Sequence, residues 1–473
     1  MLSGIGSRPD RLDLTLDDDP FQTATTGVTP DGAFEPVGYW HETVDVTPTE
    51  PLAGSHEADV VVVGGGYTGL STAHEIAIRA PELEVVLLER AAVGFGASGR
   101  NGGFVMPLLG WDMVHLASEV GSDRIEATAG FMYEAVEWLR RLIDEEELEC
   151  DKEDVGYLLL NTSPEREAHT RDDHEIATET GFEREWLEGA ALREHIDSPA
   201  FYSGTYDPVP FVVNPAKLAR ERKRLAEAAG VRVVERSPVV ALREHDAGVT
   251  VETQGGSVTA ETAVLAVNGY GEALGFRTDR FLPVHTFITM TEPLTEAQLA
   301  SIGWAQRRTS LETARNFIHY FRLTADNRIL FGGEDVQLYY GGRFHDRDGD
   351  ICLALRERFR EFFPPLSDVA FTHEWGGVLS VTMDMFPSMG AASEEGRVLF
   401  ASGYSGHGVA LGNYAGQILA PQVIERLGLE TESGPEPFFV NRDPPWVAPD
   451  PLRYTGLQLY RRALKAQDRW QGA

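Results

Sequence analysis

Lysine is scarce in this 473-residue chain, which has only Lys152, Lys217, Lys223 and Lys465. Lysine and arginine together number 41 against 74 acidic residues, which gives a formal net charge of −33. Such a charge argues against non-specific nucleic-acid binding, because that binding needs a positive patch to neutralise phosphates. An acidic chain with arginine as its main cation favours adaptation to a high-salt cytoplasm over an ordinary acidic protein, since salt screens the self-repulsion.

Cysteines and long apolar runs are also few. Cys150 and Cys352 cannot by themselves form a disulfide framework or a metal cluster, so we expect reduced thiols and no metal site. No apolar run reaches about 18 residues, so no membrane span is expected. The first 54 residues lack the cationic start and apolar core of a secretory signal, which favours a cytoplasmic protein. We expect them to form an extended arm, ordered near Tyr39-Trp40.

A strand, a glycine-rich turn and a helix follow the arm. The β-branched run 58–63 predicts a parallel strand buried on both faces, and a helix over 68–80 and a second strand over 84–88 complete a β-α-β unit. Residues 64–69 have the pattern G-x-G-x-x-G, in which Gly64 permits the turn, Gly66 lets a pyrophosphate approach, and Gly69 permits close packing. Glu89 ends the second strand, where a carboxylate can accept ribose hydroxyls. This context predicts a dinucleotide site but does not separate NAD from FAD.

Two further glycine-rich loops favour a flavin. Residues 93–103 contain five glycines, and Ser98, Arg100 and Asn101 there can add donors to the amides that face a large flat ligand. Residues 401–409 again join a buried strand to a helix, and the helix start favours a delocalised anion. His407 in this turn can add a donor, or it can be satisfied by neighbouring backbone.

The remaining pattern predicts a mixed chain. Helices are expected near 122–145, 164–181, 214–230, 350–363, 412–427 and 452–470, and strands near 231–235, 238–243, 248–254, 262–267, 284–291, 317–323, 328–333 and 398–401. Parallel-type strands occur early, near 264 and near 399, whereas antiparallel-type strands fill 284–333. We therefore expect one discontinuous nucleotide domain with a second sheet domain inserted in two pieces.

The motifs together, and in this order, resemble the FAD-dependent D-amino-acid oxidase/glycine oxidase superfamily over about residues 38–430. Residues 320–324, Asn327-Arg328 and 331–333 are most similar to the γ-glutamylputrescine oxidoreductase branch. The resemblance implies an α/β fold: a Rossmann-like FAD-binding domain of the glutathione-reductase type and an inserted α+β substrate domain on a mostly antiparallel sheet. The expected divisions are 1–54 (arm), 55–112, 205–275 and 372–430 (FAD-binding domain), 113–204 and 276–371 (substrate domain), and 431–473 (wrapping segment and final helix).

The resemblance also implies which positions contact FAD. The pyrophosphate and ribose would be held by Gly64, Gly66, Tyr67, Thr68, Gly69 and Glu89, and the adenine by the backbone of Val239. The isoalloxazine ring would be flanked by Ala97, Ser98, Arg100, Asn101, Gly102 and Gly103, and by Gly403, Ser405, Gly406, His407 and Gly408. Some relatives attach flavin to a histidine or a cysteine. Residues 90–103 contain neither, and Gly377 stands about where the cysteine would fall, so we expect non-covalent FAD.

The implied activity is oxidation of a small amine or amino acid, with hydride transfer to flavin N5 and later hydrolysis of the imine. His319 is the candidate base that keeps the amine neutral, Tyr320 its hydrogen-bond partner, and Arg322 or Arg343 the clamp for a substrate carboxylate. The alternative for His319 and Tyr320 is a structural role in the core. The alternative for Arg322 and Arg343 is an ion pair with an acidic residue at the surface. No lysine lies on the 284–333 strands, although some oxidases activate oxygen with one, so the acceptor is oxygen or a quinone or carrier. The rival hypotheses are an NAD-dependent Rossmann dehydrogenase and a flavin-binding subunit without amine oxidation of its own.

The final segment, 452–470, predicts a cationic amphipathic helix with Leu457, Tyr460 and Leu464 on one stripe. We expect it to pack on the acidic surface of this chain. The alternative is peripheral contact with a membrane that holds quinones.

Overall fold

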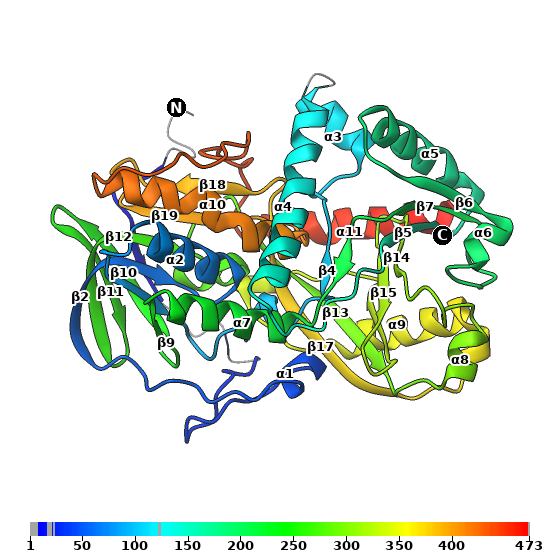
Figure 1. Cartoon of the computed structure of the whole chain (residues 1–473), viewed down its shortest axis with the longest axis horizontal. Coiled ribbons are helices and arrows are strands. Elements are labelled where there is room, and N and C mark those ends of the chain that lie inside the picture. Colours follow the sequence, from blue (N-terminus) through cyan, green and yellow to red (C-terminus); the bar gives the residue numbers. More distant parts are fainter. Residues whose placement is uncertain (1–7, 17–20, 22–23, 122–123, 472–473) are drawn as a thin grey trace.

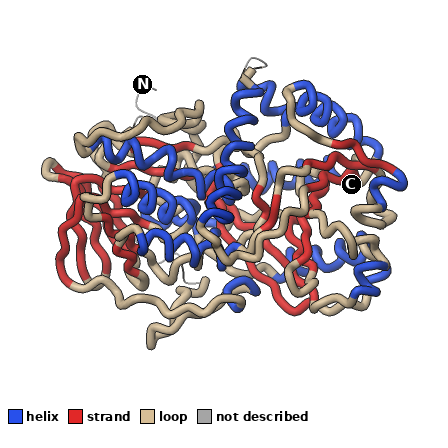
Figure 2. Tube along the Cα trace, viewed as in Figure 1, coloured by secondary structure: helices blue, strands red, loops and turns tan. Residues whose placement is uncertain are grey.

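The computed structural model describes residues 8–16, 21, 24–121 and 124–471. These residues fold around two large sheets (Figure 1). Strands gather in two separate regions, and helices cover them (Figure 2). This is the predicted α/β architecture, with a second unit on a mostly antiparallel sheet.

The nine-stranded sheet is parallel at its centre. β2 (Gly54–Val63) pairs in parallel with β3 (Val85–Leu88) and β12 (Gly256–Leu265). The side chains from Val60 to Val63 are at most 3% exposed, which explains the unbroken β-branched run. The parallel part continues through β9 (Arg232–Val234) and β19 (Val398–Ser402). Antiparallel strands join it: β1 (Asp13–Thr15), β10 (Val239–His245), β11 (Gly248–Thr253) and β18 (Ser388–Ala391).

Helices α2 (Tyr67–Arg79), α7 (Pro215–Ala228) and α10 (Gly408–Arg426) pack together against this sheet, and α4 (Ile125–Glu145) packs on α10 (Figure 1). Close contact between α2 and α10 requires small residues. A Cβ at Gly416 would lie 2.4 Å from the backbone oxygen of Ser71. Helix α10 starts at Gly408, earlier than the predicted 412.

The eight-stranded sheet has the order β17-β13-β16-β15-β14-β5-β7-β6 and is antiparallel except for the β14–β5 pair. Its strands are β5 (Tyr157–Asn161), β6 (Glu185–Glu188), β7 (Ser203–Asp207), β13 (Leu282–Thr291), β14 (Ser310–Thr313), β15 (His319–Leu323), β16 (Ile329–Gly333) and β17 (Phe371–Val381). Trp304, Phe321, Phe331 and Phe359 form an aromatic core between this sheet and α9 (Gly349–Phe362). Strands β5, β6, β7, β14 and β17 were not predicted, and β17 extends this sheet beyond the boundary expected at residue 371.

Smaller elements connect and flank the two units. They are α3 (Met113–Val120), α5 (Pro164–Glu179), α6 (Gly189–Arg193), α8 (Glu296–Ala300) and the short pair of β4 (Phe104–Val105) with β8 (Phe211–Val212). No helix among the described residues combines the length and the apolarity that crossing a membrane requires.

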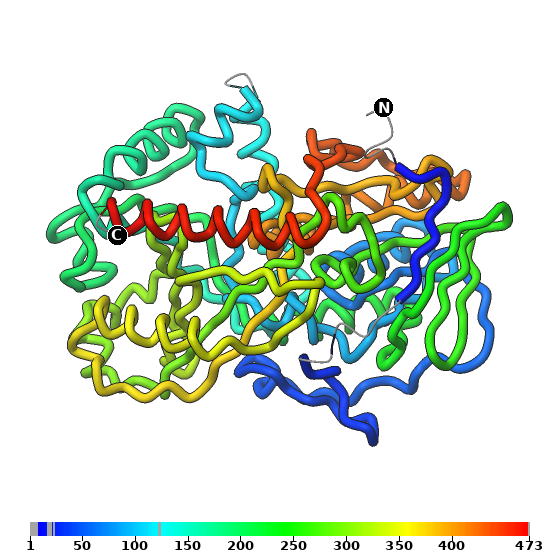
Figure 3. Tube along the Cα trace, turned by 180° about the vertical axis from the view of Figure 1, so that it is seen from behind, coloured from blue at the N-terminus to red at the C-terminus, as the bar shows by residue number. Residues whose placement is uncertain are grey.

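Segments from both ends of the chain pack on the body. Helix α1 (Tyr39–Glu42) buries Trp40, which is 2% exposed, so the expected order at Tyr39-Trp40 is confirmed. Helix α11 (Leu452–Trp470) crosses the back of the molecule (Figure 3). Its Arg461 and Lys465 pair with Asp335, so the expected docking on acidic groups of this chain is also confirmed.

Candidate active site

A cavity of about 1240 Å³ lies between the two units. Its wall includes the glycine-rich turn before α2, the start of α10, and the face of the eight-stranded sheet that carries Tyr320. Sites for drug-sized ligands occupy roughly 300–1,000 Å³. The cavity therefore has room for a large ligand and a second, small one.

The turn before α2 has the geometry of an anion site. Gly64 has a φ of +110°, and a Cβ there would lie 2.5 Å from the backbone oxygen of Ala266. A Cβ at Gly69 would lie 1.9 Å from the backbone oxygen of Gly64, so this glycine permits the packing of helix on strand and does not line the cavity. Gly66 caps α2 without a side chain, and the Tyr67 N–H donates to Ser98 Oγ at 2.9 Å. The positive helix start thus opens on the cavity, as phosphate binding requires.

Glu89 closes one side of this turn. Its carboxylate accepts hydrogen bonds from the Gly65 N–H at 2.7 Å and from the Ala91 N–H at 2.9 Å. Burial raises its pKa, although these hydrogen bonds oppose the shift. Glu89 and Val239 both line the cavity, as the sequence predicts for contacts to a ribose and an adenine.

The 93–103 loop is shaped by its own polar side chains. Arg100 Nε donates to the Phe95 oxygen at 2.8 Å, and its guanidinium pairs with Asp346. Asn101 Nδ2 donates to the Ala97 oxygen at 3.0 Å, and its Oδ1 accepts from the Gly103 N–H at 2.7 Å. Ala97, Ser98, Arg100, Asn101 and Gly102 line the cavity, whereas Gly103 does not. The side chains predicted as donors to a ligand are therefore engaged within the protein, and they fix the course of the loop.

Helix α1 supports this loop from outside, which the sequence did not indicate. Trp40 Nε1 donates to the Asn101 oxygen at 2.9 Å, and His41 Nε2 lies 3.1 Å from the Gly94 oxygen.

The turn before α10 offers a second open helix start. Ser405, Gly406, His407 and Gly408 line the cavity, whereas Gly403 does not. His407 is the N-cap, and no side chain caps this helix. Burial lowers the pKa of His407 to about 4, so the ring is neutral at pH 7.

At the end of the cavity that holds the two helix starts, His407 Nδ1 and Asn268 Oδ1 are among the buried polar atoms of the wall that have no hydrogen-bond partner. Such atoms are costly unless a ligand or water satisfies them. Together with two uncapped helix starts, they fit a large ligand that carries phosphates and a polar ring system. The cavity side chains are therefore suited to a dinucleotide such as FAD.

Strand β15 carries the three predicted catalytic residues, and only Tyr320 of the three lines the cavity. Because side chains alternate between the two faces of a strand, Tyr320 and its neighbour His319 point to opposite sides. Tyr320 lines the cavity, and its hydroxyl hydrogen-bonds with Thr286. His319 lies outside the cavity wall, 1% exposed, with Nε2 2.7 Å from Glu334 Oε2. Burial lowers its pKa to about 4. His319 is thus not placed to take a proton from a molecule in the cavity, because its ring faces the aromatic core.

Arg322 is also outside the cavity wall, as is Arg343. Arg322 is 1% exposed and donates to the backbone oxygens of Val213 at 2.7 Å and Gly103 at 3.3 Å. Burial lowers its pKa to about 10. The predicted clamp for a substrate carboxylate instead ties the glycine-rich loop to the second sheet, because the backbone carbonyls occupy its donors.

Glu312 is a cavity residue that the sequence analysis missed. It lies on β14 directly opposite Tyr320 on β15 and lines the cavity. Tyr157 hydrogen-bonds with its carboxyl group, and burial raises the pKa of that group to about 7. The sequence offered little signal, because the four-residue strand 310–313 reads Ser-Leu-Glu-Thr and has a single apolar residue.

Three further ionisable residues line the cavity: Asp112, His115 and His169. Asp112 holds α3 to α5, because its oxygens lie 2.8 Å from His115 Nδ1 and 2.8 Å from His169 Nε2. The nitrogen and oxygen atoms with which these three residues could bind a metal lie within 4.8 Å of one another. The sequence did not predict a metal site here. Hydrogen bonds from the two histidines lower the pKa of Asp112 to about 2, against the effect of burial.

Comparisons with known proteins agree with this geometry. The sequence profile described as FAD dependent oxidoreductase matches residues 59–422. The chain is 31% identical over 394 residues to a probable oxidoreductase, OrdL, of Haemophilus influenzae, covering 80% of this chain and 86% of that one. It is 31% identical over 379 residues to the gamma-glutamylputrescine oxidoreductase of Escherichia coli, covering 79% and 85%. The crystal structure of glycine oxidase from Geobacillus kaustophilus superposes with a TM-score of 0.67 at 21% identity, covering 80% and 96%.

Proposed function

Because the chain belongs to the family of FAD dependent oxidoreductases, we propose that it oxidises a C–N bond of a small amine with FAD bound in the cavity. The observation that carries the proposal is the continuity of the cavity, which joins the glycine-rich turn before α2 to Tyr320 on the second sheet. The family membership argues against the rival NAD-dependent dehydrogenase. One relative is a gamma-glutamylputrescine oxidoreductase, so γ-glutamylputrescine and similar amines are the first substrates to test.

The residues proposed to hold FAD follow from the cavity wall. The helix start at Gly66–Thr68 would bind the pyrophosphate, Glu89 the ribose and Val239 the adenine. The start of α10, with His407 and Gly408, would face the ring system. Bound FAD supplies an acceptor for the hydride equivalent that leaves the carbon next to the amine nitrogen.

The chain itself contributes by positioning the amine and by keeping water away from the reacting carbon. Tyr320 and Ile288 belong to one apolar cluster and form the wall on which the amine would lie, and Tyr320 is close to Gly102 of the glycine-rich loop. The amine must lose its ammonium proton before oxidation, and water hydrolyses the imine product afterwards to a carbonyl compound and ammonia or an amine. Holding the reacting carbon in one place supplies most of the rate gain available here.

We propose that FAD is held without a covalent bond. Among the described residues, the buried thiols Cys150 and Cys352 lie outside the cavity wall, and residues 90–103 contain no histidine. Acid or urea should therefore release all of the flavin into a protein-free filtrate. Flavin that stays with the precipitated chain would contradict this.

The electron acceptor is proposed to be oxygen or a quinone or carrier protein in the cytoplasm. None of the four lysines is part of the described cavity wall. Stopped-flow mixing of reduced enzyme with oxygen, and separately with a water-soluble quinone, would measure which one reoxidises it faster.

The test of the function is anaerobic reduction of the bound flavin. The purified holoenzyme is mixed with γ-glutamylputrescine, putrescine, N-methylglycine and glycine, and loss of the visible flavin absorbance is followed. Bleaching by at least one amine, with release of the matching carbonyl product, is expected. A yellow protein that no amine bleaches would instead support a flavin-binding subunit without amine oxidation of its own.

A further inference from the structure

Most charged groups on the cavity wall already have partners. The carboxylates of Asp173 and Asp207 lie beside Arg184, and Asp335 pairs with Arg461 and Lys465. Asp112 binds two histidines, and Glu89 binds backbone N–H groups at the dinucleotide turn. Within the described part of the chain, Glu312 is the carboxylate of the cavity wall that has neither a cation nor a backbone N–H as partner. An acid in this position is a candidate for binding a cationic ligand.

The arginines of the cavity wall show the same pattern. Arg100, Arg166, Arg184, Arg236 and Arg461 each pair with a carboxylate, and Arg90 stacks on the rings of Phe21 and Phe95. Arg315 remains: its Nε is buried without a hydrogen bond, and its guanidinium forms no ion pair with a described carboxylate.

The next residue in the chain carries a second unsatisfied donor. Asn316 Nδ2 is also buried without a partner, and both residues line the cavity. The nearby acids are engaged elsewhere. Asp468 pairs with Arg166 and accepts from the backbone N–H groups of Asn316 and Phe317, and Glu334 binds His319 and Arg358. Unsatisfied donors on two consecutive residues of the cavity wall, one of them a guanidinium, suit a carboxylate.

We propose, on the basis of the amine oxidation proposed above, that the substrate carries two charges held by this chain: its amine end by Glu312, and a distant carboxylate by Arg315 and Asn316. Glu312 lies opposite Tyr320 on the sheet, and the ring of Tyr320 lies close to Gly102 of the glycine-rich loop. Arg315 lies beyond the turn at Thr313, beneath α11. Glu312 lies within β14 and Arg315 in the loop that follows this strand, so the proposed substrate class is an amine with its carboxylate several atoms away. An α-amino acid carries both groups on one carbon and would reach one end only.

The test compares three ligands of nearly equal length on the FAD-loaded enzyme. These are δ-aminovalerate, with both charges; n-pentylamine, with the amine alone; and valerate, with the carboxylate alone. Anaerobic flavin reduction gives a rate and an apparent Kd for the two amines, and perturbation of the flavin spectrum gives a Kd for valerate. We expect wild type to bind δ-aminovalerate about 10- to 100-fold more tightly than n-pentylamine, as a charge-assisted hydrogen bond allows.

Two variants separate the ends. Arg315→Gln should remove the preference for δ-aminovalerate and weaken valerate binding, and leave n-pentylamine unchanged. Glu312→Gln should weaken both amines about 10- to 100-fold or more and leave valerate unchanged or tighter. Arg307→Gln, on the exposed surface, is the matched control. Flavin content and Tm verify that each variant folds.

The outcomes are distinct. If Arg315→Gln raises the apparent Kd of both amines equally, or changes neither, Arg315 does not bind the substrate carboxylate. If Glu312→Gln leaves the apparent Kd of both amines unchanged, Glu312 does not bind the amine end of the substrate. If no amine reduces wild-type flavin, the proposed function fails instead. Valerate binding that is lost in Arg315→Gln would then still support the carboxylate subsite.

Discussion

The carboxylate of Asp468, near the end of α11, accepts a hydrogen bond from the backbone N–H of Phe317 over 3.1 Å. Asp468 is 3% exposed and also pairs with Arg166. Through these contacts, the last helix fixes the turn that leads into β15 and its cavity residue Tyr320.

Replacement of Asp468 should therefore impair amine oxidation more than FAD binding. Asp468→Ala leaves Arg166 and two backbone N–H groups without their acceptor, and breaking a buried pair costs about 3–5 kcal/mol. We expect a lower Tm and a kcat/KM for amines reduced about tenfold or more, with FAD content kept. The exposed neighbour gives the control Gln467→Ala. Unchanged kinetics and Tm would show that α11 does not position the turn.

Arg322 should act on the cofactor loop. Its Nη1 donates to the oxygens of Val213 and Gly103 and its Nε to the oxygen of Leu323, and the single nitrogen of a lysine cannot occupy both donor positions. We expect Arg322→Lys to weaken FAD binding about tenfold and to change the fluorescence of the bound flavin. Equilibrium dialysis measures the first effect. A variant with wild-type FAD affinity and a merely lower Tm would place Arg322 in the packing of the fold alone.

Glu312 should make stability depend on pH. Burial raises its folded-state pKa from 4.5 to about 7, so the folded chain holds this proton more tightly than the unfolded chain. Its stabilising effect is complete below the unfolded pKa and is lost as pH rises through about 7. Relative to Glu312→Gln, wild type should therefore lose up to about 3 kcal/mol between pH 4.5 and 8, as followed by urea unfolding. Parallel pH profiles of the two proteins would contradict the shifted pKa.

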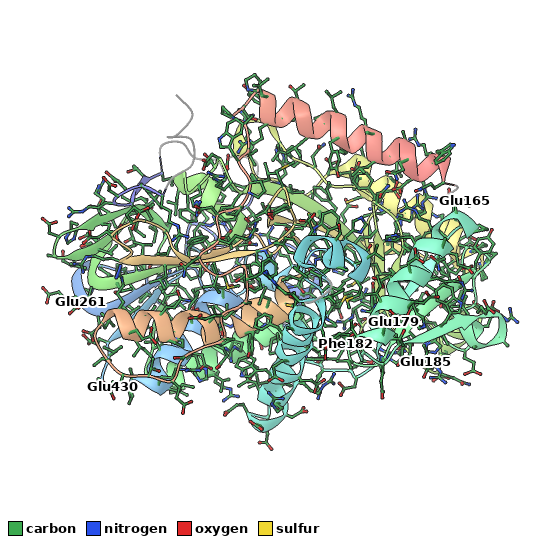
Figure 4. The ribbon with its side chains drawn as sticks, turned by 90° about the horizontal axis from the view of Figure 1, so that it is seen from above. Glu165, Glu179, Phe182, Glu185, Glu261 and Glu430 are labelled. Atoms are coloured by element: carbon green, nitrogen blue, oxygen red, sulfur yellow. The ribbon has the colours of Figure 1, made fainter. Side chains whose placement is uncertain are left out.

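The acidic surface should make the fold depend on salt. Glu165, Glu179, Glu185, Glu261 and Glu430 are exposed and lie on the periphery of the molecule (Figure 4). At about 1 M salt the screening length falls to about 3 Å, which removes most of the repulsion from a net charge of −33. We expect Tm to rise markedly with KCl. Sucrose is the control, because it strengthens burial without screening charge. An equal rise in sucrose would argue against charge repulsion as the cause.

The nucleotide unit was predictable because its signals are local. A β-branched run such as Val60–Val63, the glycine pattern before α2, and Glu89 at a strand end each follow from contacts within about 30 residues. Gly64, Gly66 and Glu89 line the cavity, and their contacts to FAD stay a prediction. The open turn before α10 was likewise visible from the sequence.

The substrate side was less predictable because its geometry depends on long-range pairing. His319 and Tyr320 are neighbours in sequence, and strand alternation sends one to the aromatic core and the other to the cavity. Which neighbour faces which side depends on the register with β14 and β16, and no local pattern fixes that register. Glu312 was missed for the same reason, since its importance comes from having no charged partner in three dimensions.

The two helix starts that face the cavity begin at Tyr67 and Gly408. During synthesis the ribosome completes the first long before the second exists. A cofactor that uses both starts is therefore captured only after translation has passed residue 408, and until then the early β-α-β unit has an unfinished ligand pocket.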